Sequence, residues 1–343
     1  MSWLVIGSCA RELAIIKKLK KDDPKVKLYC VGNNKNPEIL SIVENFSVIS
    51  NLDNLLKFCK LYKIKYAVIG PEKYLAIGIV DLLESHNIKC IGPSQKLARI
   101  ETNKFYARQL IEKNGSSPYN PIYKHFTSLN THEQIKDYYK FCEKLDFKYV
   151  IKSTKLCSGK GVKVSGVHFK NDLEGFMYTL DLLNNNHTVL IEEKLEGDEF
   201  TLMSYSDGTY FSHMPVITDF KQLEKENSPN TGSMGCISYS NHRAPFLTES
   251  DIVTAREINC KTVEYLTKDN KELYKGIIYG SYIKCYSGEI KIIEFNSRYG
   301  DPECINALEL LETSLYDIYK GIIYNRLVYI TPIYSNLNMV SKY

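Results

Sequence analysis

The chain has 343 residues, of which 44% are hydrophobic and 24% are charged, and its formal net charge is +4. These values are ordinary for a soluble globular protein of two or three domains. No block of Lys and Arg and no apolar run of membrane-spanning length is present, so we expect neither a nucleic-acid nor a membrane partner. The 10 cysteines are spread singly without metal-site spacing, which favours reduced thiols in a cytoplasmic protein over a disulfide framework or a zinc site.

The first hundred residues alternate short apolar runs with amphipathic segments. We expect strands at 3–6, 27–31, 66–69 and 88–91, and helices at about 10–21, 52–62 and 75–86. This alternation predicts an α/β fold with a parallel sheet covered on both faces, in which ligands bind beyond the carboxyl ends of the strands. The turns at 7–12 and 70–72 lie at such ends. The first turn has only Gly7 of a GxGxxG pattern, so by itself it fits an ordinary strand–helix turn as well as a binding loop.

A glycine-rich turn marks the middle of the chain. Before it we expect one or two helices over 95–114, a linker over 116–121, a helix over 133–145 and a strand over 149–152. The turn itself, residues 158–162, carries a lysine and can place N–H groups and an ammonium around a polyphosphate. It is not a Walker A loop, and by itself an ordinary hairpin is the more frequent interpretation. Lys152 on the preceding strand is either a snorkelled surface lysine or a second phosphate contact.

Two further segments are candidates for ligand contact. Glu192 and Glu193 end an apolar strand at 189–193, where they are either a solvated strand end or groups whose backbone reads an adenine edge. Glu199 is placed to accept hydrogen bonds from a ribose. The glycines at 230–235 suit a close approach of backbone to a ligand, although composition slightly favours a flexible loop.

Polar groups gather at the end of the last strand of a hairpin, which we expect at 276–285 and 289–296 after a long helix at 249–266. Because side chains alternate along a strand, Glu294, Asn296 and Arg298 share one face if the extension persists. Carboxylate and amide oxygens are ligands that Mg²⁺ accepts beside phosphates, and a guanidinium suits a phosphate or a carboxylate. A solvated strand end is the ordinary interpretation, but the 300–302 turn and the 158–162 turn favour a binding site.

These motifs form an ordered series. The chain carries GPE at 70–72, IGPS at 91–94, Lys at 104, VIK at 150–152, SGKGV at 158–162, IEE-KLEGDE at 191–199, PNTGSMG at 229–235 and IEFNSRYGDPE at 293–303. From Trp3 to about Asn325 the series resembles the phosphoribosylamine–glycine ligase (glycinamide ribonucleotide synthetase) family, which are ATP-grasp enzymes of purine synthesis. The pair PNTG-x-MG and IEFN-x-R-x-GDPE is highly specific.

The resemblance implies a Rossmann-like N-terminal domain and a two-lobed α+β ATP-grasp module. The implied boundaries are a substrate domain at 1–100, a helical linker at 101–120, a small lobe with a mobile phosphate loop at 121–192 and a large lobe with the metal and substrate sites at 193–343. The implied cofactors are ATP and Mg²⁺ or Mn²⁺, and the implied substrates are glycine and phosphoribosylamine. Whether the protein is a monomer or a homodimer stays open.

The resemblance also implies roles for individual residues. The nucleotide-binding residues are Lys104, Lys152, Ser158, Gly159, Lys160, Gly161, Glu192, Glu193, Leu195 and Glu199. The metal ligands are Glu294 and Asn296, and the catalytic groups are Lys152, Lys160 and Arg298. The substrate-binding residues are Gly7, Arg11, Glu12, Gly70, Pro71, Glu72, Asp219, Lys221, Asn230, Thr231, Gly232, Met234, Arg298 and Asp301.

Several segments depart from the family pattern. The glycine-rich first loop is Gly-Ser-Cys-Ala at 7–10, the DHKR segment is Asp-Phe-Lys-Gln at 219–222, and Ser-Thr-Lys-Leu-Cys stands at 153–157 in place of small residues. The family continues past GDPE into a further C-terminal domain, whereas here 40 residues (304–343) follow that motif. Two alternatives therefore stay open: an ATP-grasp ligase for a different carboxylate and amine, and a non-catalytic nucleotide-binding relative.

Overall fold

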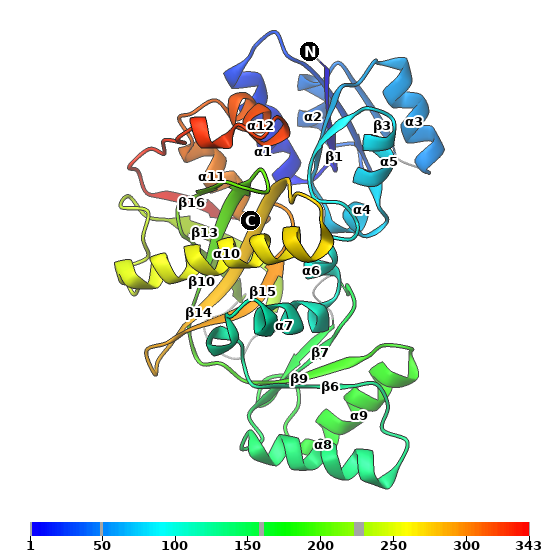
Figure 1. Ribbon diagram of the computed structural model, residues 1–343, viewed down its shortest axis with the longest axis vertical. Helices are drawn as coiled ribbons and strands as arrows, with labels where there is room; N and C mark the ends of the chain where they lie inside the picture. The colour runs from blue at the N-terminus through cyan, green and yellow to red at the C-terminus, as the bar shows by residue number, and fades with distance from the viewer. Residues whose placement is uncertain (1, 49–50, 158–160, 223–229, 343) are drawn as a thin grey trace.

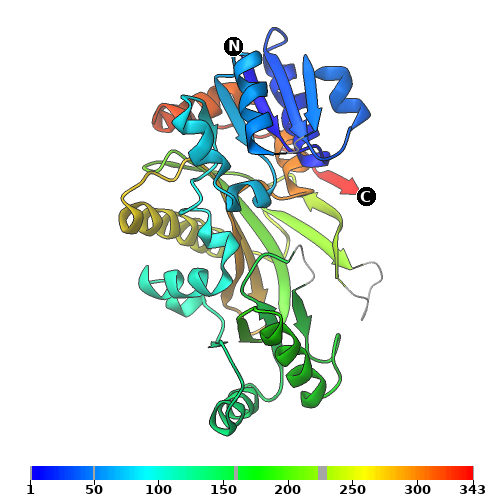
Figure 2. The ribbon, with the colours of Figure 1, turned by 90° about the vertical axis from the view of Figure 1, so that its right-hand side faces the viewer.

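The computed structural model describes residues 2–48, 51–157, 161–222 and 230–342. The described strands form three sheets that follow one another along the long axis of the molecule (Figure 1 and Figure 2). The N-terminal sheet lies at one end, the largest sheet lies in the middle, and a four-stranded sheet lies at the other end. The short helix α6 (Arg99–Thr102) and the helix α7 (Lys104–Lys113) connect the first sheet to the others.

The N-terminal sheet is parallel, with the strand order β3-β2-β1-β4-β5. Its elements are β1 (Ser2–Ile6), α1 (Ala10–Asp22), β2 (Lys27–Gly32), α2 (Pro37–Ile42), β3 (Asn45–Val48), α3 (Leu52–Leu61), β4 (Tyr66–Ile69), α4 (Glu72–Ala76), α5 (Ile79–Ser85) and β5 (Lys89–Ile91). Trp3 and Val5 pack on the α1 side, whereas Leu4 and Ile6 pack on the α3 and α5 side. The predicted parallel sheet with both faces covered is therefore confirmed.

In this part of the chain one expectation is wrong and two short elements were not predicted. The single helix expected over 75–86 is wrong, because Gly78 adopts a left-handed backbone conformation (φ +75°) that separates α4 from α5. The segment between β2 and α3 holds α2 and β3, which the apolar pattern does not indicate. Asn36 caps α2 and a proline follows it at the first helical position, so a start signal was present in the sequence.

The four-stranded sheet is antiparallel, with the order β6-β9-β7-β8. Its elements are β6 (Tyr123–Phe126), α8 (His132–Lys144), β7 (Tyr149–Ser153), β8 (Val162–Val164), α9 (Asp172–Asn184) and β9 (Val189–Glu193), preceded by the 3₁₀ turn η1 (Ser117–Tyr119). Tyr149, Ile151 and Ile191 pack under α8 and α9. Because side chains alternate along a strand, Lys152 and Glu192, which follow Ile151 and Ile191, lie on the opposite face of the sheet.

The middle sheet is antiparallel, with the order β15-β14-β10-β12-β13-β16, and β11 pairs with β10. Its strands are β10 (Gly197–Ser206), β11 (Phe211–His213), β12 (Ile217–Gln222), β13 (Asn230–Ser238), β14 (Gly276–Cys285), β15 (Ile290–Asn296) and β16 (Met339–Lys342). Helix α10 (Glu249–Asn270) covers one face through Leu202 and Ile278. Helices α11 (Glu303–Leu310) and α12 (Leu315–Ile323) pack on the other face with Met203, Tyr205 and Ile277, and the turn η2 (Leu327–Tyr329) follows.

The composition-based preference for a loop over 230–235 is wrong, because these residues begin strand β13. Its partners are β12 on one side and β16 on the other, and β16 lies about a hundred residues later in the chain. Gly235 has a φ of +143°, and a Cβ there would lie 2.2 Å from the carbonyl oxygen of Ser341. At Gly235 the group that approaches closely is therefore the backbone of the neighbouring strand β16.

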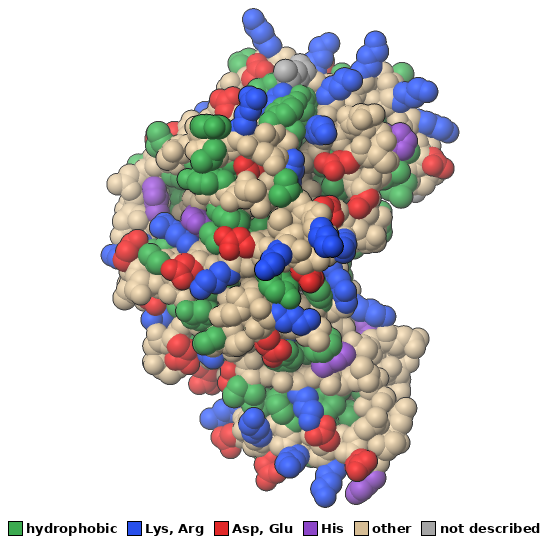
Figure 3. Space-filling model, in the orientation of Figure 1, with side chains coloured by type: hydrophobic (Ala, Val, Ile, Leu, Met, Phe, Trp, Pro, Cys, Tyr) green, Lys and Arg blue, Asp and Glu red, His purple; other side chains and the backbone are tan. Residues whose placement is uncertain are grey.

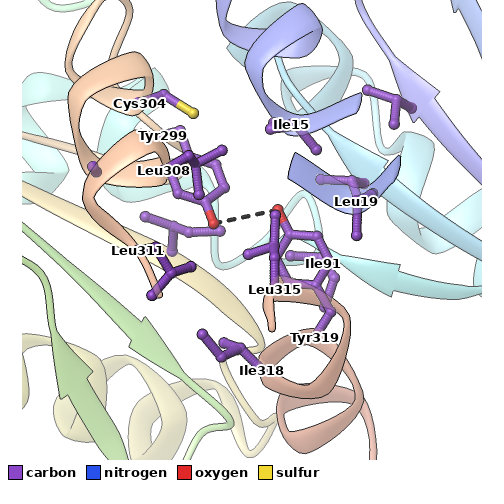
Figure 4. Close-up of a cluster of buried hydrophobic side chains, with 14 of the residues drawn as sticks. Ile15, Leu19, Ile91, Tyr299, Cys304, Leu308, Leu311, Leu315, Ile318 and Tyr319 are labelled. Carbon is purple, nitrogen blue, oxygen red and sulfur yellow. Dashed lines mark hydrogen bonds between the residues drawn. The ribbon is translucent and has the colours of Figure 1, made fainter. Parts of the chain in front are cut away.

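One hydrophobic core joins the N-terminal sheet to the middle sheet. Ile15 and Leu19 of α1 meet Leu308 of α11 and Leu315 of α12 in this core (Figure 4). Tyr299 lies among them, and its hydroxyl donates to that of Tyr205 at 3.1 Å and accepts from that of Tyr319 at 3.3 Å. The two sheets thus share buried side chains. Within the described ranges, no helix combines the length and apolar character needed to cross a membrane.

Candidate active site

A pocket lies where the linker helices, the segment before β8 and the end of β15 meet. Its described lining residues are Glu72, Ile100, Glu101, Lys104, Ala107, Arg108, Ile111, Leu156, Cys157, Gly161, Val162, Ile293, Glu294, Phe295, Asn296 and Arg298. The outline of the molecule is hollowed between the N-terminal domain and the four-stranded sheet (Figure 3). Six residues with predicted roles therefore line one pocket: Glu72, Lys104, Gly161, Glu294, Asn296 and Arg298.

The polar end of β15 forms one wall of this pocket. The Asn296 amide lies 3.5 Å from Glu294 Oε1, and Arg298 donates to Asn296 Oδ1 at 3.3 Å, so the prediction that these three side chains share one face is confirmed. Burial opposes ionisation of Glu294, but the nearby ammonium groups of Lys104, Lys221 and Lys152 hold the pKa of its carboxyl below the ordinary value. Glu294 is therefore a carboxylate at neutral pH.

Arg298 lies between two carboxylates from the N-terminal part of the chain. Its guanidinium is 3.0 Å from Glu101 and 3.4 Å from Glu72. Glu101 also accepts hydrogen bonds from the N–H and hydroxyl groups of Ser297, at 2.8 and 2.9 Å. Burial disfavours the charge of Arg298, but Glu101 and Glu72 raise its pKa. Glu101 is not among the predicted site residues, and it precedes Lys104 by three residues in a mainly buried segment.

Lys152 and Glu192 form a buried ionic cluster with Arg108. Lys152 Nζ lies 2.7 Å from Glu192 Oε2, and Arg108 donates to both oxygens of the same carboxylate at 2.7 and 2.9 Å. Lys152 is 9% exposed and Glu192 is 2% exposed, so the interpretations as a surface lysine and a solvated strand end are wrong. Burial opposes the charge of Glu192, but Arg108 and Lys152 lower its pKa to about 2.

The segment that enters the glycine-rich turn is attached to the start of α7. The Lys104 N–H donates to the Thr154 carbonyl at 3.0 Å, and Lys104 Nζ donates to the Lys155 carbonyl at 3.5 Å. Gly161 closes the turn, where a Cβ would lie 2.7 Å from that of Cys157. Ser158, Gly159 and Lys160 lie outside the described residues, so their roles stay predictions. Glu193 accepts from the Ile122 N–H at 2.8 Å, which fixes the chain entering β6.

Residues of β10, β12 and β13 extend the polar wall beyond Glu294. Lys221 donates to Glu199 at 3.0 Å, and Ser233 donates to Asp219 at 2.6 Å. Burial, followed by the charge of Glu303, raises the pKa of Asp219 to about 6. Thr231 donates to the Lys221 carbonyl at 2.8 Å, and Leu195 and Met234 are half-buried. Asn230 and Gly232 are described only as positions of β13.

The two N-terminal turns meet at Glu12. A Cβ on Gly7 would lie 2.5 Å from the Glu12 side chain, and one on Gly70 would lie 2.0 Å from Glu12 Oε1, so both glycines make room for this carboxylate. Glu12 accepts from the Cys9 N–H at 2.8 Å and from Arg11 at 2.7 Å. Pro71 then occupies the N-cap position of α4, which begins at Glu72.

The carbonyl of Tyr299 connects these turns to the end of β15. It accepts from Arg11 and from Arg298, each at 3.1 Å. Asp301 adds a negative charge close to Arg11. The switch point of the parallel sheet, where the order reverses between β1 and β4, therefore faces the same polar region as Glu294.

A parallel N-terminal sheet, followed by two antiparallel sheets that enclose a lysine- and carboxylate-lined pocket, defines an ATP-grasp enzyme. The phosphoribosylglycinamide synthetase N-domain model matches residues 1–101, and the model of the ATP-grasp (A) domain of the same synthetase matches residues 102–304. The chain belongs to the phosphoribosylglycinamide synthetase family and is an ATP-dependent ligase.

Individual relatives agree with this assignment. The phosphoribosylamine–glycine ligase of Pyrococcus horikoshii is 36% identical over 326 residues, which cover 94% of this chain and 72% of that protein. The ligase of Methanocaldococcus jannaschii is 38% identical over 352 residues, which cover 100% of this chain and 77% of that protein.

Solved structures share the fold. The phosphoribosylamine–glycine ligase of Thermotoga maritima has a TM-score of 0.76 at 23% identity, covering 100% of this chain and 80% of that chain. Biotin carboxylase of Campylobacter jejuni, in complex with an ATP analogue, has a TM-score of 0.73 at 16% identity, covering 98% of this chain and 74% of that chain. The fold is therefore shared with proteins that differ widely from this chain in sequence.

Proposed function

We propose that this protein joins glycine to 5-phosphoribosylamine in de novo purine synthesis, with ATP as the energy source, and forms glycinamide ribonucleotide, ADP and phosphate. The observation that carries the proposal is the match of both family domains over residues 1–304. The described pocket agrees with it, because the reaction needs positioned cations and carboxylates and no side-chain nucleophile.

The reaction has two displacement steps. A glycine carboxylate oxygen attacks the γ-phosphorus of ATP, the bond to the bridging oxygen breaks, and ADP leaves with that electron pair. The amine nitrogen of phosphoribosylamine then attacks the carbonyl carbon of glycyl phosphate, phosphate leaves, and the nitrogen loses a proton. The protein contributes in-line positioning and neutralisation of developing negative charge.

We assign nucleotide binding to the pocket between the four-stranded and middle sheets. Lys104 and Lys152 bind phosphate oxygens, and the turn of Ser158, Gly159, Lys160 and Gly161 contributes N–H groups and an ammonium. Backbone groups of Glu192, Glu193 and Leu195 bind the adenine, and Glu199 binds the ribose. Support comes from Lys104 and Gly161, which line the pocket, and from Lys152, which Glu192 holds on the face turned away from α8 and α9.

We assign the divalent metal to Glu294 and Asn296, whose oxygens suit Mg²⁺ or Mn²⁺. Among the described residues no group of three or more Asp, Glu, His or Cys could hold a metal by itself. Two protein oxygens fit an ion that takes its remaining ligands from nucleotide phosphates and water. When bound, the metal supplies Lewis-acid neutralisation of phosphate charge.

We assign glycine and phosphoribosylamine to the surface that joins the N-terminal turns to β12 and β13. Arg298 and Asp301 lie at its centre, flanked by Gly7, Arg11, Glu12, Gly70, Pro71, Glu72, Asp219, Lys221, Asn230, Thr231, Gly232 and Met234. The shared Tyr299 carbonyl between Arg11 and Arg298 supports this assignment. We further propose the domain boundaries at residues 100, 120 and 192, a cytoplasmic location, and small molecules rather than nucleic acid or membrane as partners.

A coupled assay of ADP release tests the function. With freshly made phosphoribosylamine, ADP release should require ATP, glycine and the amine, each omitted in turn. ADP release that is indifferent to glycine or the amine contradicts the proposal. Turnover only with another pair from a phosphate-release screen selects the alternative ligase, and tight ATP binding without turnover for any pair selects the non-catalytic relative.

A further inference from the structure

Arg108 of α7 is buried at the junction of the four-stranded and middle sheets, and it is not among the residues assigned a role above. It is 3% exposed although its side chain lines the pocket. A buried guanidinium inside an ATP-binding pocket can either contact the nucleotide or hold other groups in place. The hydrogen bonds of Arg108 decide between these roles.

Every N–H donor of the Arg108 guanidinium is already used by the protein. A guanidinium has five donors, and Arg108 makes five hydrogen bonds: Nε to Glu192 Oε1, Nη1 to Asn120 Oδ1 and to the Ile292 carbonyl, and Nη2 to Glu192 Oε2 and to the Ile293 carbonyl. The five distances lie between 2.7 and 3.3 Å. No donor is left for a ligand unless one of these bonds breaks.

Asn120 apart, the partners of Arg108 come from two sheets. Glu192 belongs to β9 of the four-stranded sheet, and the carboxylate that Arg108 grips also holds Lys152 Nζ at 2.7 Å. The two carbonyls belong to β15 of the middle sheet, and they immediately precede Glu294. The residue proposed to bind phosphate and the residue proposed to bind metal are therefore connected through one side chain.

We propose that Arg108 is a positioning residue that fixes Lys152 and Glu294 relative to each other by joining β9 to β15. Through Glu192 it sets the location of the phosphate-binding ammonium, and through the main chain it sets the location of the metal-binding carboxylate. A lysine cannot replace it, because an ammonium has three donors and lacks the planar geometry that reaches a carboxylate and two carbonyls together. This inference rests on the proposed function of Lys152 and Glu294.

The test compares Arg108→Lys, Arg108→Met, Glu192→Gln and the double variant Arg108→Met/Glu192→Gln with the wild-type protein. The control is Arg99→Met, an exposed arginine of α6 that stacks on Tyr106 outside the pocket. Two quantities are measured: the Kd of a non-hydrolysable ATP analogue with Mg²⁺, without other substrates, and kcat with the KM values for ATP and glycine. Circular dichroism checks the fold of each variant.

We expect Arg108→Lys to raise the Kd of the analogue and to lower kcat/KM for ATP by about tenfold or more, while the KM for glycine stays within about twofold. Because Arg108 acts partly through Glu192, the double variant should lose less than the product of the two single losses. Arg99→Met should match the wild type.

Three results would overturn the proposal. The first is a Kd of the analogue and a kcat/KM for ATP in Arg108→Lys that both stay within about twofold of wild type. The second is a loss of affinity in the double variant equal to the product of the losses in Arg108→Met and Glu192→Gln. The third is an equal rise in the KM values for glycine and ATP. If Arg108→Met does not fold, Arg108→Lys and Glu192→Gln carry the test. Failure of the proposed function is recognised separately, because the analogue Kd is measured without glycine and phosphoribosylamine.

Discussion

Two arginines line the same pocket, and they differ in how many hydrogen bonds their guanidinium groups make to the protein. Arg108 makes hydrogen bonds with all five N–H donors, to groups fixed on β9, β15 and the linker. Arg298 donates to Asn296 and to the Tyr299 carbonyl and makes ionic contacts with Glu101 at 3.0 Å and Glu72 at 3.4 Å, and its Nε has no hydrogen bond to the described residues.

This difference distinguishes an arginine that holds protein groups in place from an arginine that binds a ligand. A guanidinium whose five donors all make hydrogen bonds gains nothing from a ligand, whereas one held partly by ionic contacts can exchange such a contact for a ligand carboxylate or phosphate. The number of hydrogen bonds that each guanidinium makes expresses this difference, and four variants test how far it holds.

The largest effect is expected at Glu294, which follows the two carbonyls that Arg108 binds and lines the same pocket as both arginines. Glu294→Ala should lower kcat by about a hundredfold or more, because the metal and the phosphates lose their carboxylate partner. The fold should persist, since the side chain lines a pocket. ADP release measures the loss, and Glu289→Ala, an exposed carboxylate of the same hairpin, is the control. Near-normal turnover in Glu294→Ala would refute the metal assignment.

Arg298→Lys sharpens the contrast with Arg108. We expect kcat/KM for glycine to fall by about tenfold to a hundredfold, because the forked contact to a carboxylate is lost. The Kd of an ATP analogue should change much less, which is the reverse of the pattern expected for Arg108→Lys. Steady-state kinetics with each substrate varied in turn measure the effect, and exposed Arg326→Lys is the control. An unchanged kcat/KM for glycine in Arg298→Lys would mean that Arg298 has a structural role like that of Arg108.

Gly70→Ala tests the N-terminal side of the same polar network. The new Cβ would lie 2.0 Å from Glu12 Oε1, so Glu12 and its partner Arg11 must shift. We expect the free energy of unfolding to fall by about 1–3 kcal/mol, together with weaker substrate binding. Denaturant titration measures the first effect. A variant as stable as wild type would show that the turn has room that the Glu12 contact does not reveal.

The smallest effect is a dependence of stability on pH that is carried by Glu192. Its pKa of about 2 in the folded protein lies below the ordinary value of 4.5, so its charge stabilises the protein above pH 4.5 and this contribution is lost as the pH falls toward 2. Glu192→Gln removes the contribution. The stability difference between wild type and variant should therefore shrink between about pH 5 and pH 3.5, as measured by denaturant titration. A constant difference would mean that Glu192 is not held by Arg108 and Lys152.

Features set by neighbouring residues could be predicted from the sequence. The alternation of strands and helices gave the parallel N-terminal sheet, and the two-residue period of β15 placed Glu294, Asn296 and Arg298 together. Ordered motifs indicated the ATP-grasp family before any geometry was known. These inferences depend on spacings within a few residues.

Features set by distant partners could not be predicted. Arg108 bonds to groups 84 and 184 residues away, and Glu101 holds Ser297 across 196 residues, while neither stands in a motif. Strand β13 is glycine-rich and forms because β12 and β16 pair with it on either side. Local propensity favoured a loop there, and tertiary pairing prevailed over it.

Tyr299 has a consequence for movement in this enzyme. Its carbonyl binds Arg11 of α1 together with Arg298, while its hydroxyl lies in a buried chain with Tyr205 of β10 and Tyr319 of α12. Sliding the N-terminal sheet over the middle sheet would break the Arg11 bond and expose the hydrophobic core that the two sheets share, so we expect them to move as one unit. We therefore expect any closure around ATP to be a movement of the four-stranded sheet, whose connection to the middle sheet includes the hydrogen bonds of Arg108.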